Sequence, residues 1–183
     1  MRYRVYYQNA GSINIENLVS KMNEHKDMFN SLFGPDNWVF TGSAAVAIYA
    51  NKYSPKELEN LDEPGDLDIL VKSKSLLTIP KIGDYKKVQD TLERSMTFSN
   101  PSSGESIDVA TVPSIRKIVV DGFPLCDISL LLKEYNDVLS GNREKDIKKI
   151  RVLEKIKDLV ERPQVEEERD FSHLAGIRKG PLF

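Results

Sequence analysis

The first third of the chain alternates between helical and strand spacing of its hydrophobic residues. Within residues 15–33 the apolar positions recur at helical spacing, and Gly34-Pro35 then stops the pattern, which predicts a helix. The aromatic and β-branched segment 3–7 predicts a short strand before it. The continuous apolar run 38–41 predicts a buried strand after it. His25 has polar sequence neighbours, so we expect it to be exposed on the helix.

A tight turn follows the buried strand directly. Gly42-Ser43 supplies the turn, and residues 44–50 are small, apolar and helix-favouring. The local prediction is therefore strand, turn and helix. The polar stretch 51–65 contains two prolines and is expected to cross the surface, and a second buried strand over 67–72 emerges from it.

The middle of the chain is expected to be mainly loop and strand. Residues 73–87 have the composition of a loop with a short element, and 88–92 are expected to form a brief helix. The segments 95–99 and 106–112 flank a five-residue loop rich in turn formers, which predicts an antiparallel hairpin. Residues 117–120 add one more predicted strand.

The spacing changes to a helical period after Pro124. One apolar stripe runs over 131–139, with Ser129 as its expected N-cap and Gly141 as its stop. A second stripe runs over 147–160, and two helices joined this tightly should pack as an antiparallel pair. Residues 163–183 carry little apolar content, so this tail is expected to be loosely ordered or to dock onto a protein partner.

The composition is typical of a soluble globular protein. Its 183 residues suffice for one compact unit, and the hydrophobic fraction of 40% and charged fraction of 30% are ordinary for such proteins. No apolar run approaches the ~20 residues that span a bilayer, and the N-terminus lacks a secretory signal. We therefore expect a cytoplasmic protein without a membrane role. The single cysteine, Cys126, excludes an internal disulfide and is expected to be a small buried hydrophobe.

Charge gives no general attraction to nucleic acid, since the formal net charge is −2. Basic residues concentrate in 143–162, where they are interleaved with acidic ones. Mixed signs at these spacings are typical of a solvated helix face with local ion pairs, and that is our interpretation. An RNA-binding strip is the alternative.

The candidate chemistry centres on three aspartates. Asp66 and Asp68 stand two residues apart at the mouth of a predicted strand, so both carboxylates lie on one face. Adjacent carboxylates are best tolerated around a divalent cation, and such oxygen ligands suit Mg²⁺ or Mn²⁺. Asp108 lies within the otherwise apolar strand segment 106–110, where an acid is costly unless paired or metal-bound.

Together these features indicate phosphoryl-transfer chemistry. Three carboxylates from neighbouring strands can hold two metal ions ~3.5–4 Å apart. Gly42-Ser43 at a helix N-terminus offers backbone N–H groups and a positive dipole to a polyphosphate. Lys72 and Lys74 are candidate phosphate partners, although surface solubility explains them equally well. A calcium loop beginning at Asp62 is excluded, because its twelfth position is Ser73 and not the required Glu.

At these residues the sequence resembles the DNA polymerase beta-type nucleotidyltransferase superfamily, including its small minimal-type members. The matching pattern is an apolar strand entering Gly-Ser, a helix, an Asp-x-Asp pair on a second strand and a lone acid on a third. The resemblance implies an α/β (α+β) fold with a nucleotidyltransferase-like mixed β-sheet, flanking helices and a C-terminal helical hairpin. The expected division is a catalytic domain over 1–125, including the N-terminal strand and helix, the hairpin over 126–162, and a tail over 163–183.

The resemblance also implies roles for the site residues. Asp66 and Asp68 would bind both metals, Asp108 would bind the catalytic metal and help to deprotonate the acceptor, and Gly42 and Ser43 would hold the triphosphate. The expected activity is metal-dependent transfer of a nucleotidyl group from a nucleoside triphosphate to a hydroxyl of a protein, RNA or small molecule.

Two departures separate the chain from the family pattern. The interval between Ser43 and Asp66 is longer than usual, and no Arg or Lys follows Gly42-Ser43 directly. One alternative is therefore a catalytically silent protein of the same fold that binds nucleotide or a protein partner. A second alternative is a plain α/β interaction module in which the aspartates are structural.

Overall fold

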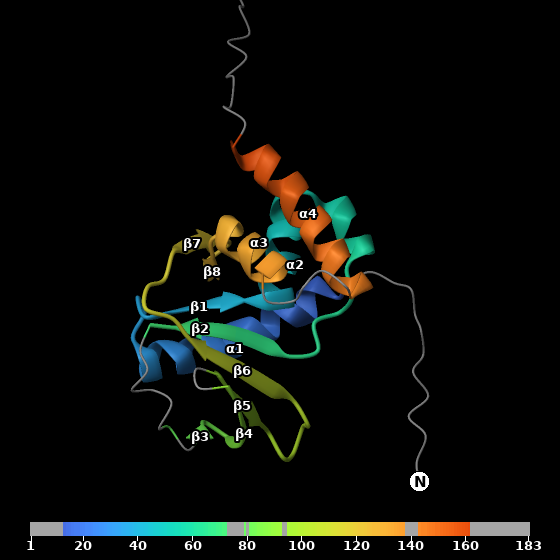
Figure 1. Cartoon of the computed structure of the whole chain (residues 1–183). Helices are drawn as coiled ribbons and strands as arrows, with labels where there is room; N and C mark the ends of the chain where they lie inside the picture. The colour runs from blue at the N-terminus through green and yellow to red at the C-terminus, as the bar shows by residue number, and fades with distance from the viewer. Residues whose placement is uncertain (1–12, 73–78, 80, 93–94, 138–142, 162–183) are drawn as a thin grey trace, which may run out of the picture.

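An eight-stranded mixed β-sheet forms the centre of the protein (Figure 1). The structure is a computed structural model that describes residues 13–72, 79, 81–92, 95–137 and 143–161. The strand order across the sheet is β3-β4-β5-β6-β2-β1-β8-β7. The strands are β1 (Trp38–Thr41), β2 (Leu67–Val71), β3 (Lys81–Ile82), β4 (Tyr85–Leu92), β5 (Ser95–Ser99), β6 (Ser106–Thr111), β7 (Lys117–Val120) and β8 (Phe123–Cys126).

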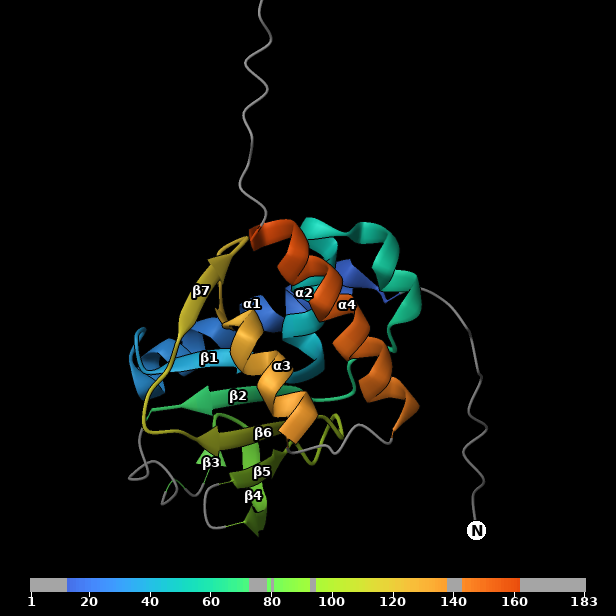
Figure 2. The same cartoon turned by 45° about the horizontal axis from the view of Figure 1, so that its top comes forward.

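Three of the helices gather at one end of the sheet (Figures 1 and 2). Figures 1 and 2 show α2, α3 and α4 together over the part that holds β1, β8 and β7, whereas β3, β4 and β5 extend away from them. Helix α2 packs against β1, β2 and α4, and α3 packs against α4. None of the described helices is both long enough and apolar enough to cross a membrane. The helices are α1 (Ile15–Phe33), α2 (Gly42–Tyr53), the 3₁₀ helix η1 (Pro55–Asn60), α3 (Ile128–Asp137) and α4 (Glu144–Glu161).

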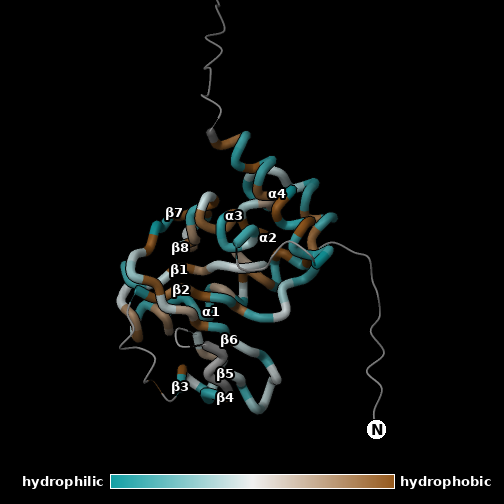
Figure 3. The backbone as a smooth tube through the Cα atoms, in the orientation of Figure 1, coloured by the Kyte–Doolittle hydropathy of each residue, from teal (hydrophilic) through white to brown (hydrophobic). Residues whose placement is uncertain are grey.

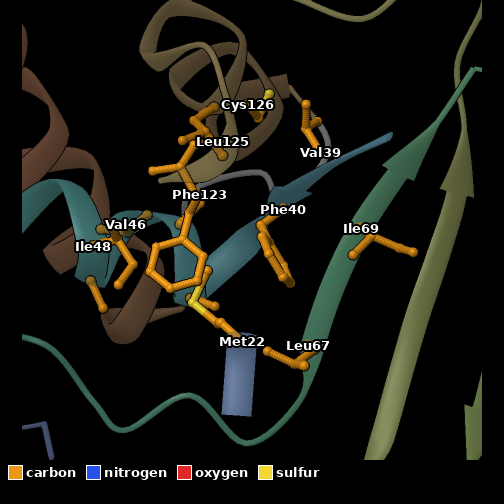
Figure 4. Close-up of a cluster of buried hydrophobic side chains, with 14 of the residues drawn as sticks. Met22, Val39, Phe40, Val46, Ile48, Leu67, Ile69, Phe123, Leu125 and Cys126 are labelled. Carbon is orange, nitrogen blue, oxygen red and sulfur yellow. The ribbon is translucent and has the colours of Figure 1, made fainter. Parts of the chain in front are cut away.

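The hydrophobic core lies between the central strands and the helices that cover them. All seven residues of 44–50 on α2 are buried, which explains why this helix is apolar all round and rich in alanine. Figure 4 shows Phe40 of β1 and Phe123 of β8 among the buried side chains around α2. Figure 3 shows hydrophobic and hydrophilic stretches alternating along α4, as expected for a helix with one face on the core.

Helix α1 is attached to the sheet through aromatic contacts. The ring centroids of Phe29 and Trp38 lie 5.0 Å apart in an edge-to-face arrangement, and both side chains are fully buried. The Trp38 indole N–H also donates to Asn30 Oδ1 at 3.0 Å. The helix ends at Gly34, whose N–H donates to the Asn30 carbonyl, and the predicted stop at this glycine is confirmed.

Several predicted elements are confirmed. The strand, turn and helix predicted over 38–50 form β1 and α2, although α2 begins at Gly42 and continues to Tyr53, and the predicted hairpin forms β5 and β6 in antiparallel pairing. The predicted strand 117–120 is β7. The two C-terminal apolar stripes form α3 and α4.

The expectation of a helix over 88–92 is wrong, because this segment belongs to β4. Strand β4 pairs with β5 through two register shifts, one between Lys87 and Gln89 and one between Asp90 and Leu92. Each irregularity interrupts the alternation of the two faces, so the sequence lacks the period of two that marks a strand.

Strand β8 and the start of α3 also differ from the prediction. Residues 123–126 form a buried strand between β1 and β7, which the sequence interpretation did not assign. Helix α3 is capped by Asp127, because its Oδ1 accepts from the N–H groups of Ser129 and Leu130, at 2.9 and 3.3 Å. Ser129 is therefore not the N-cap.

His25 is buried, contrary to the expectation from its neighbours in sequence. Its Nδ1 lies 2.8 Å from the Lys21 carbonyl oxygen and its Nε2 lies 2.9 Å from the Tyr85 hydroxyl of β4. Its neighbours one turn away, Met22 and Phe29, are core residues. The helical spacing therefore places His25 on the buried face, whatever its adjacent residues are.

Three predictions lie outside the described residues. These are the strand 3–7, the stop at Gly141 and the tail 163–183 with its proposed partner contact.

Candidate active site

The site residues lie in a row across the central strands. Strands β1 and β2 are antiparallel and pair Thr41 with Asp68, whereas β2 and β6 are parallel and pair Asp68 with Asp108. Strand β5 continues the row, since Thr97 pairs with Asp108. The alternate residues Leu67 and Ile69 face the core, so Asp68 faces the opposite side of the sheet. Backbone pairing therefore fixes the positions of the carboxylates.

Hydroxyl groups orient two of the three predicted aspartates. The Thr97 hydroxyl donates to Asp108 Oδ1 at 2.6 Å, and the Ser106 hydroxyl donates to Asp66 Oδ1 at 2.5 Å. Each contact uses one oxygen of the carboxylate. The second oxygen of each group has lone pairs for a further ligand.

Gly42 stands directly against the Asp68 carboxylate. Its φ is +61°, and a Cβ added there would lie 2.0 Å from Asp68 Oδ2. Only glycine fits this position, because it tolerates the backbone angle and leaves room for the acid. The turn at the start of α2 and the carboxylate of β2 are thus neighbours in space.

All five predicted site residues line one cavity of about 510 Å³. The structure also brings to it residues that the sequence interpretation did not assign. Two are on α3 and three are at or near the start of α4, and the rest belong to the segment before β2. The full lining is Gly42, Ser43, Asp62, Glu63, Gly65, Asp66, Asp68, Asp108, Glu134, Tyr135, Arg143, Lys145 and Lys149.

Burial and neighbouring acids together raise the pKa of Asp68 to about 7 from its ordinary value of 3.8. Burial is the largest cause, followed by the charges of Asp108, Glu134 and Asp66, whereas Lys149 acts in the opposite direction. Glu134 is partly buried and accepts from the Thr41 hydroxyl at 3.1 Å. Burial raises the pKa of the Glu134 carboxyl despite this hydrogen bond.

Basic side chains face the acids from the start of α4. Lys149 is only 7% exposed, and its Nζ lies 5.1 Å from the centroid of the Tyr135 ring. Burial lowers the pKa of the Lys149 ammonium group. The basic run was interpreted as a solvated face, and for Lys149 that interpretation is wrong. Arg143, Lys145 and Lys149 give the cavity the cations that are missing directly after Ser43.

Lys72 does not reach the site. It follows β2 at the end opposite to Asp66, and four residue steps along an extended strand place it about 13 Å from Asp68. Lys74 lies outside the described residues. The structure therefore places neither lysine at the cavity.

The donor set fits a hard divalent cation. Asp66, Asp68 and Asp108 supply only oxygen ligands, and three acidic side chains that line one cavity favour a cation among them. Among the described residues, however, no three acidic, histidine or cysteine side chains form a closed ligand cluster. Mg²⁺ commonly binds through one or two carboxylates together with water and substrate phosphates, so an incomplete protein cluster suits it.

A second hollow of about 530 Å³ lies between η1 and α4 and contains none of the predicted site residues. Its charges are balanced, because three basic and three acidic residues line it: Lys148, Arg151, Lys155, Glu57, Glu154 and Asp158. Lys155 Nζ lies 2.7 Å from Glu57 Oε1. This arrangement is an ion-paired helix surface, as the sequence interpretation expected for most of α4.

Comparisons with known proteins bear on the fold. The sequence matches no protein-family model and no curated protein. Among solved structures, the chain is similar to the Megavirus polyadenylate synthase, with a TM-score of 0.56 and 15% sequence identity. The match covers 84% of this chain and 33% of the other, so this chain spans about a third of that protein. The chain thus has the predicted mixed α/β architecture, and its fold is nucleotidyltransferase-like.

Proposed function

We propose that the protein is a metal-dependent nucleotidyltransferase that moves a nucleotidyl group from a nucleoside triphosphate to a hydroxyl acceptor. One observation carries the proposal: the three aspartates, the Gly42-Ser43 turn and three basic residues of the α4 region line one cavity. The similarity in fold to a polyadenylate synthase supports the same reaction class.

The acidic side of the cavity is the proposed metal site. Asp66, Asp68 and Asp108 would hold Mg²⁺ or Mn²⁺, with Glu134 close enough to add to their negative charge. When bound, the cation activates the acceptor hydroxyl and neutralises charge on the leaving phosphates. The backbone pairing of Asp68 with Asp108 fixes the strands that carry them. The two carboxylates therefore need little reorganisation before a cation binds.

The basic side of the cavity and the turn are the proposed triphosphate site. The N-terminus of α2 at Gly42 and Ser43 offers backbone N–H groups to phosphate oxygens. Arg143, Lys145 and Lys149 add positive charge from the α4 region. Opposite charges on two sides of one cavity match a substrate that is itself a metal-bound polyanion.

The proposed reaction forms one bond to the α-phosphorus and breaks another. The acceptor oxygen attacks the α-phosphorus, and the bond between that phosphorus and the bridging oxygen to the β-phosphate breaks. Pyrophosphate leaves, and the acceptor proton passes to Asp108. An RNA 3′ hydroxyl is the first acceptor to test, because the similar structure is a polyadenylate synthase. Protein and small-molecule hydroxyls remain the other candidates.

A labelled-donor experiment tests the proposal. The full chain is incubated with α-labelled nucleoside triphosphates, Mg²⁺ or Mn²⁺, and RNA or protein acceptors. We expect label transfer that disappears in Asp66→Ala/Asp68→Ala. The matched control is Asp27→Ala/Asp137→Ala, which removes two exposed acids elsewhere and should transfer label normally. Transfer that survives the Asp66/Asp68 substitution would overturn the proposed mechanism.

A catalytically silent nucleotide-binding protein is the second candidate. It is favoured by the lack of a closed three-ligand metal cluster among the described residues. This alternative predicts that α-labelled triphosphate binds to the protein and is never transferred. A structural role for the aspartates predicts instead that no divalent cation binds near Asp66.

A further inference from the structure

We propose that Asp146 is a positioning residue that holds Lys149 on the phosphate side of the cavity and thereby keeps Asp68 free for a divalent cation. The proposal rests on the proposed function, because it divides one cavity between a metal and the phosphates that accompany it. It concerns a residue that does not itself line the cavity.

Asp146 is a fully buried acid whose two partners are both cavity cations. It stands in the first turn of α4, where the positive end of the helix dipole stabilises its charge. Arg143 Nε donates to its Oδ2 at 2.5 Å, and Lys149 Nζ lies 3.6 Å from its Oδ1. Oδ1 makes no hydrogen bond. A buried carboxylate with this incomplete pairing is costly for stability, which favours a functional reason for the acid.

Two acids attract Lys149: Asp146, whose Oδ1 lies 3.6 Å from its Nζ, and Asp68, which lines the same cavity as Lys149. Its charge interacts with that of Asp146 and, less strongly, with that of Asp68. Coulomb attraction grows as the distance shrinks, so the nearest acid decides where the ammonium group rests. If Asp146 lost its charge, Asp68 would be the remaining acid that acts on Lys149. An ion pair between them would occupy carboxylate oxygens that a cation needs.

The Tyr135 ring holds Lys149 from a second direction. Its centroid lies 5.1 Å from Lys149 Nζ, and its helix, α3, packs directly against α4. The ring favours a cation near its face but carries no net charge. The negative charge of Asp146 is therefore what holds the Lys149 ammonium group on the phosphate side of the cavity and away from the metal side.

Binding of Mn²⁺ alone, followed by the electron paramagnetic resonance signal of the free ion, tests the proposal without any turnover. We expect Asp146→Asn to weaken Mn²⁺ binding by about tenfold, as for a coupled charge pair. Adding Lys149→Met to that variant should restore the affinity to within about twofold of Lys149→Met alone. The matched control is Lys148→Met, which removes the adjacent lysine, lines the other hollow and should leave Mn²⁺ affinity unchanged.

The single variant Lys149→Met tests the same point without disturbing the buried acid. If Asp146 holds Lys149 away from Asp68, removal of the lysine charge should strengthen Mn²⁺ binding by no more than about threefold. A gain of about tenfold or more would show that Lys149 already occupies Asp68, which would overturn the proposal. Unchanged Mn²⁺ binding in a folded Asp146→Asn variant would overturn it equally.

The outcomes separate this proposal from the proposed function. Mn²⁺ binding that depends on Asp146 and is relieved by Lys149→Met supports the positioning role, even if no label is ever transferred. Label transfer with Mn²⁺ binding that is indifferent to Asp146 supports the transferase and refutes the positioning role. A wild-type protein that binds no Mn²⁺ refutes both.

Discussion

In the absence of metal, replacement of Asp68 by asparagine should stabilise the fold. The pKa of Asp68 rises from 3.8 to about 7 in the folded protein, mainly because the carboxyl is partly buried beside other acids. Between these two pH values the unfolded chain has lost the proton and the folded chain still binds it. The free energy of unfolding therefore falls as the pH rises from about 4 to about 7.

The size of the effect follows from the same shift. A difference of about three pH units corresponds to roughly 4 kcal/mol as an upper bound, and partial exposure reduces this to about 2 kcal/mol. For a chain of this length, Asp68→Asn should then raise the melting temperature by about 4–8 °C at pH 8 in EDTA. The gain should be small near pH 4, where the folded chain is protonated at this position and the unfolded chain is close to its own pKa of 3.8.

Melting curves by circular dichroism at pH 4, 6 and 8 provide the measurement. Asp27→Asn is the control, because this exposed acid on α1 should give no gain that depends on pH. A wild-type protein as stable as Asp68→Asn at pH 8 in EDTA would refute the account of the buried carboxylate. So would a wild-type protein that becomes more stable relative to Asp68→Asn as the pH rises.

Three further predictions concern the same site and the buried histidine. At pH 8, Mg²⁺ should raise the melting temperature of the wild type and leave Asp68→Asn unchanged, because the ion compensates the carboxylates; an equal rise in both would contradict this. Gly42→Ala should cost more than about 2 kcal/mol in urea unfolding, because the new Cβ meets Asp68, whereas Gly104→Ala, at φ +74° in open space, should cost only about 1 kcal/mol. His25→Leu should cost about 1–3 kcal/mol in the same assay, and a neutral result would show that its hydrogen bonds to the Lys21 carbonyl and Tyr85 contribute nothing.

Local patterns were sufficient to predict strands β1, β2, β5 and β6 and the site residues that they carry. The Asp66-Leu67-Asp68 segment signals its geometry through the period of two, and Gly42-Ser43 signals a turn between a strand and a helix. The structure places these residues and Asp108 on one cavity. That agreement arises because each signal is contained in a few consecutive residues.

The remaining cavity residues depend on packing that no local pattern encodes. Glu134 and Tyr135 reach the site because α3 lies beside α4, and Lys149 because α4 packs on α2. One signal was present in the sequence and not used. Asp146 and Lys149 stand three residues apart near the apolar positions of α4, so helical spacing places them close to its buried face.

The β4 segment was not predicted as a strand although its pairing partner is close in sequence. Its register shifts against β5 remove the alternation on which strand prediction relies. Its pairing partner is nevertheless the adjacent strand in sequence. The hairpin therefore forms through backbone hydrogen bonds that tolerate a weak side-chain pattern.

Because β1 pairs directly with β2, the length of the connection between these strands does not determine how Thr41 and Asp68 are placed. Thr41 and Asp68 are opposite each other whatever lies between them, and the intervening residues are taken up by α2, η1 and a short segment before Asp66. Lengthening such a connection costs little entropy. A peptide tag or a sensor domain inserted near η1 should therefore leave the pairing of Thr41 with Asp68 unchanged, which makes this connection a practical attachment point for reporters of substrate binding.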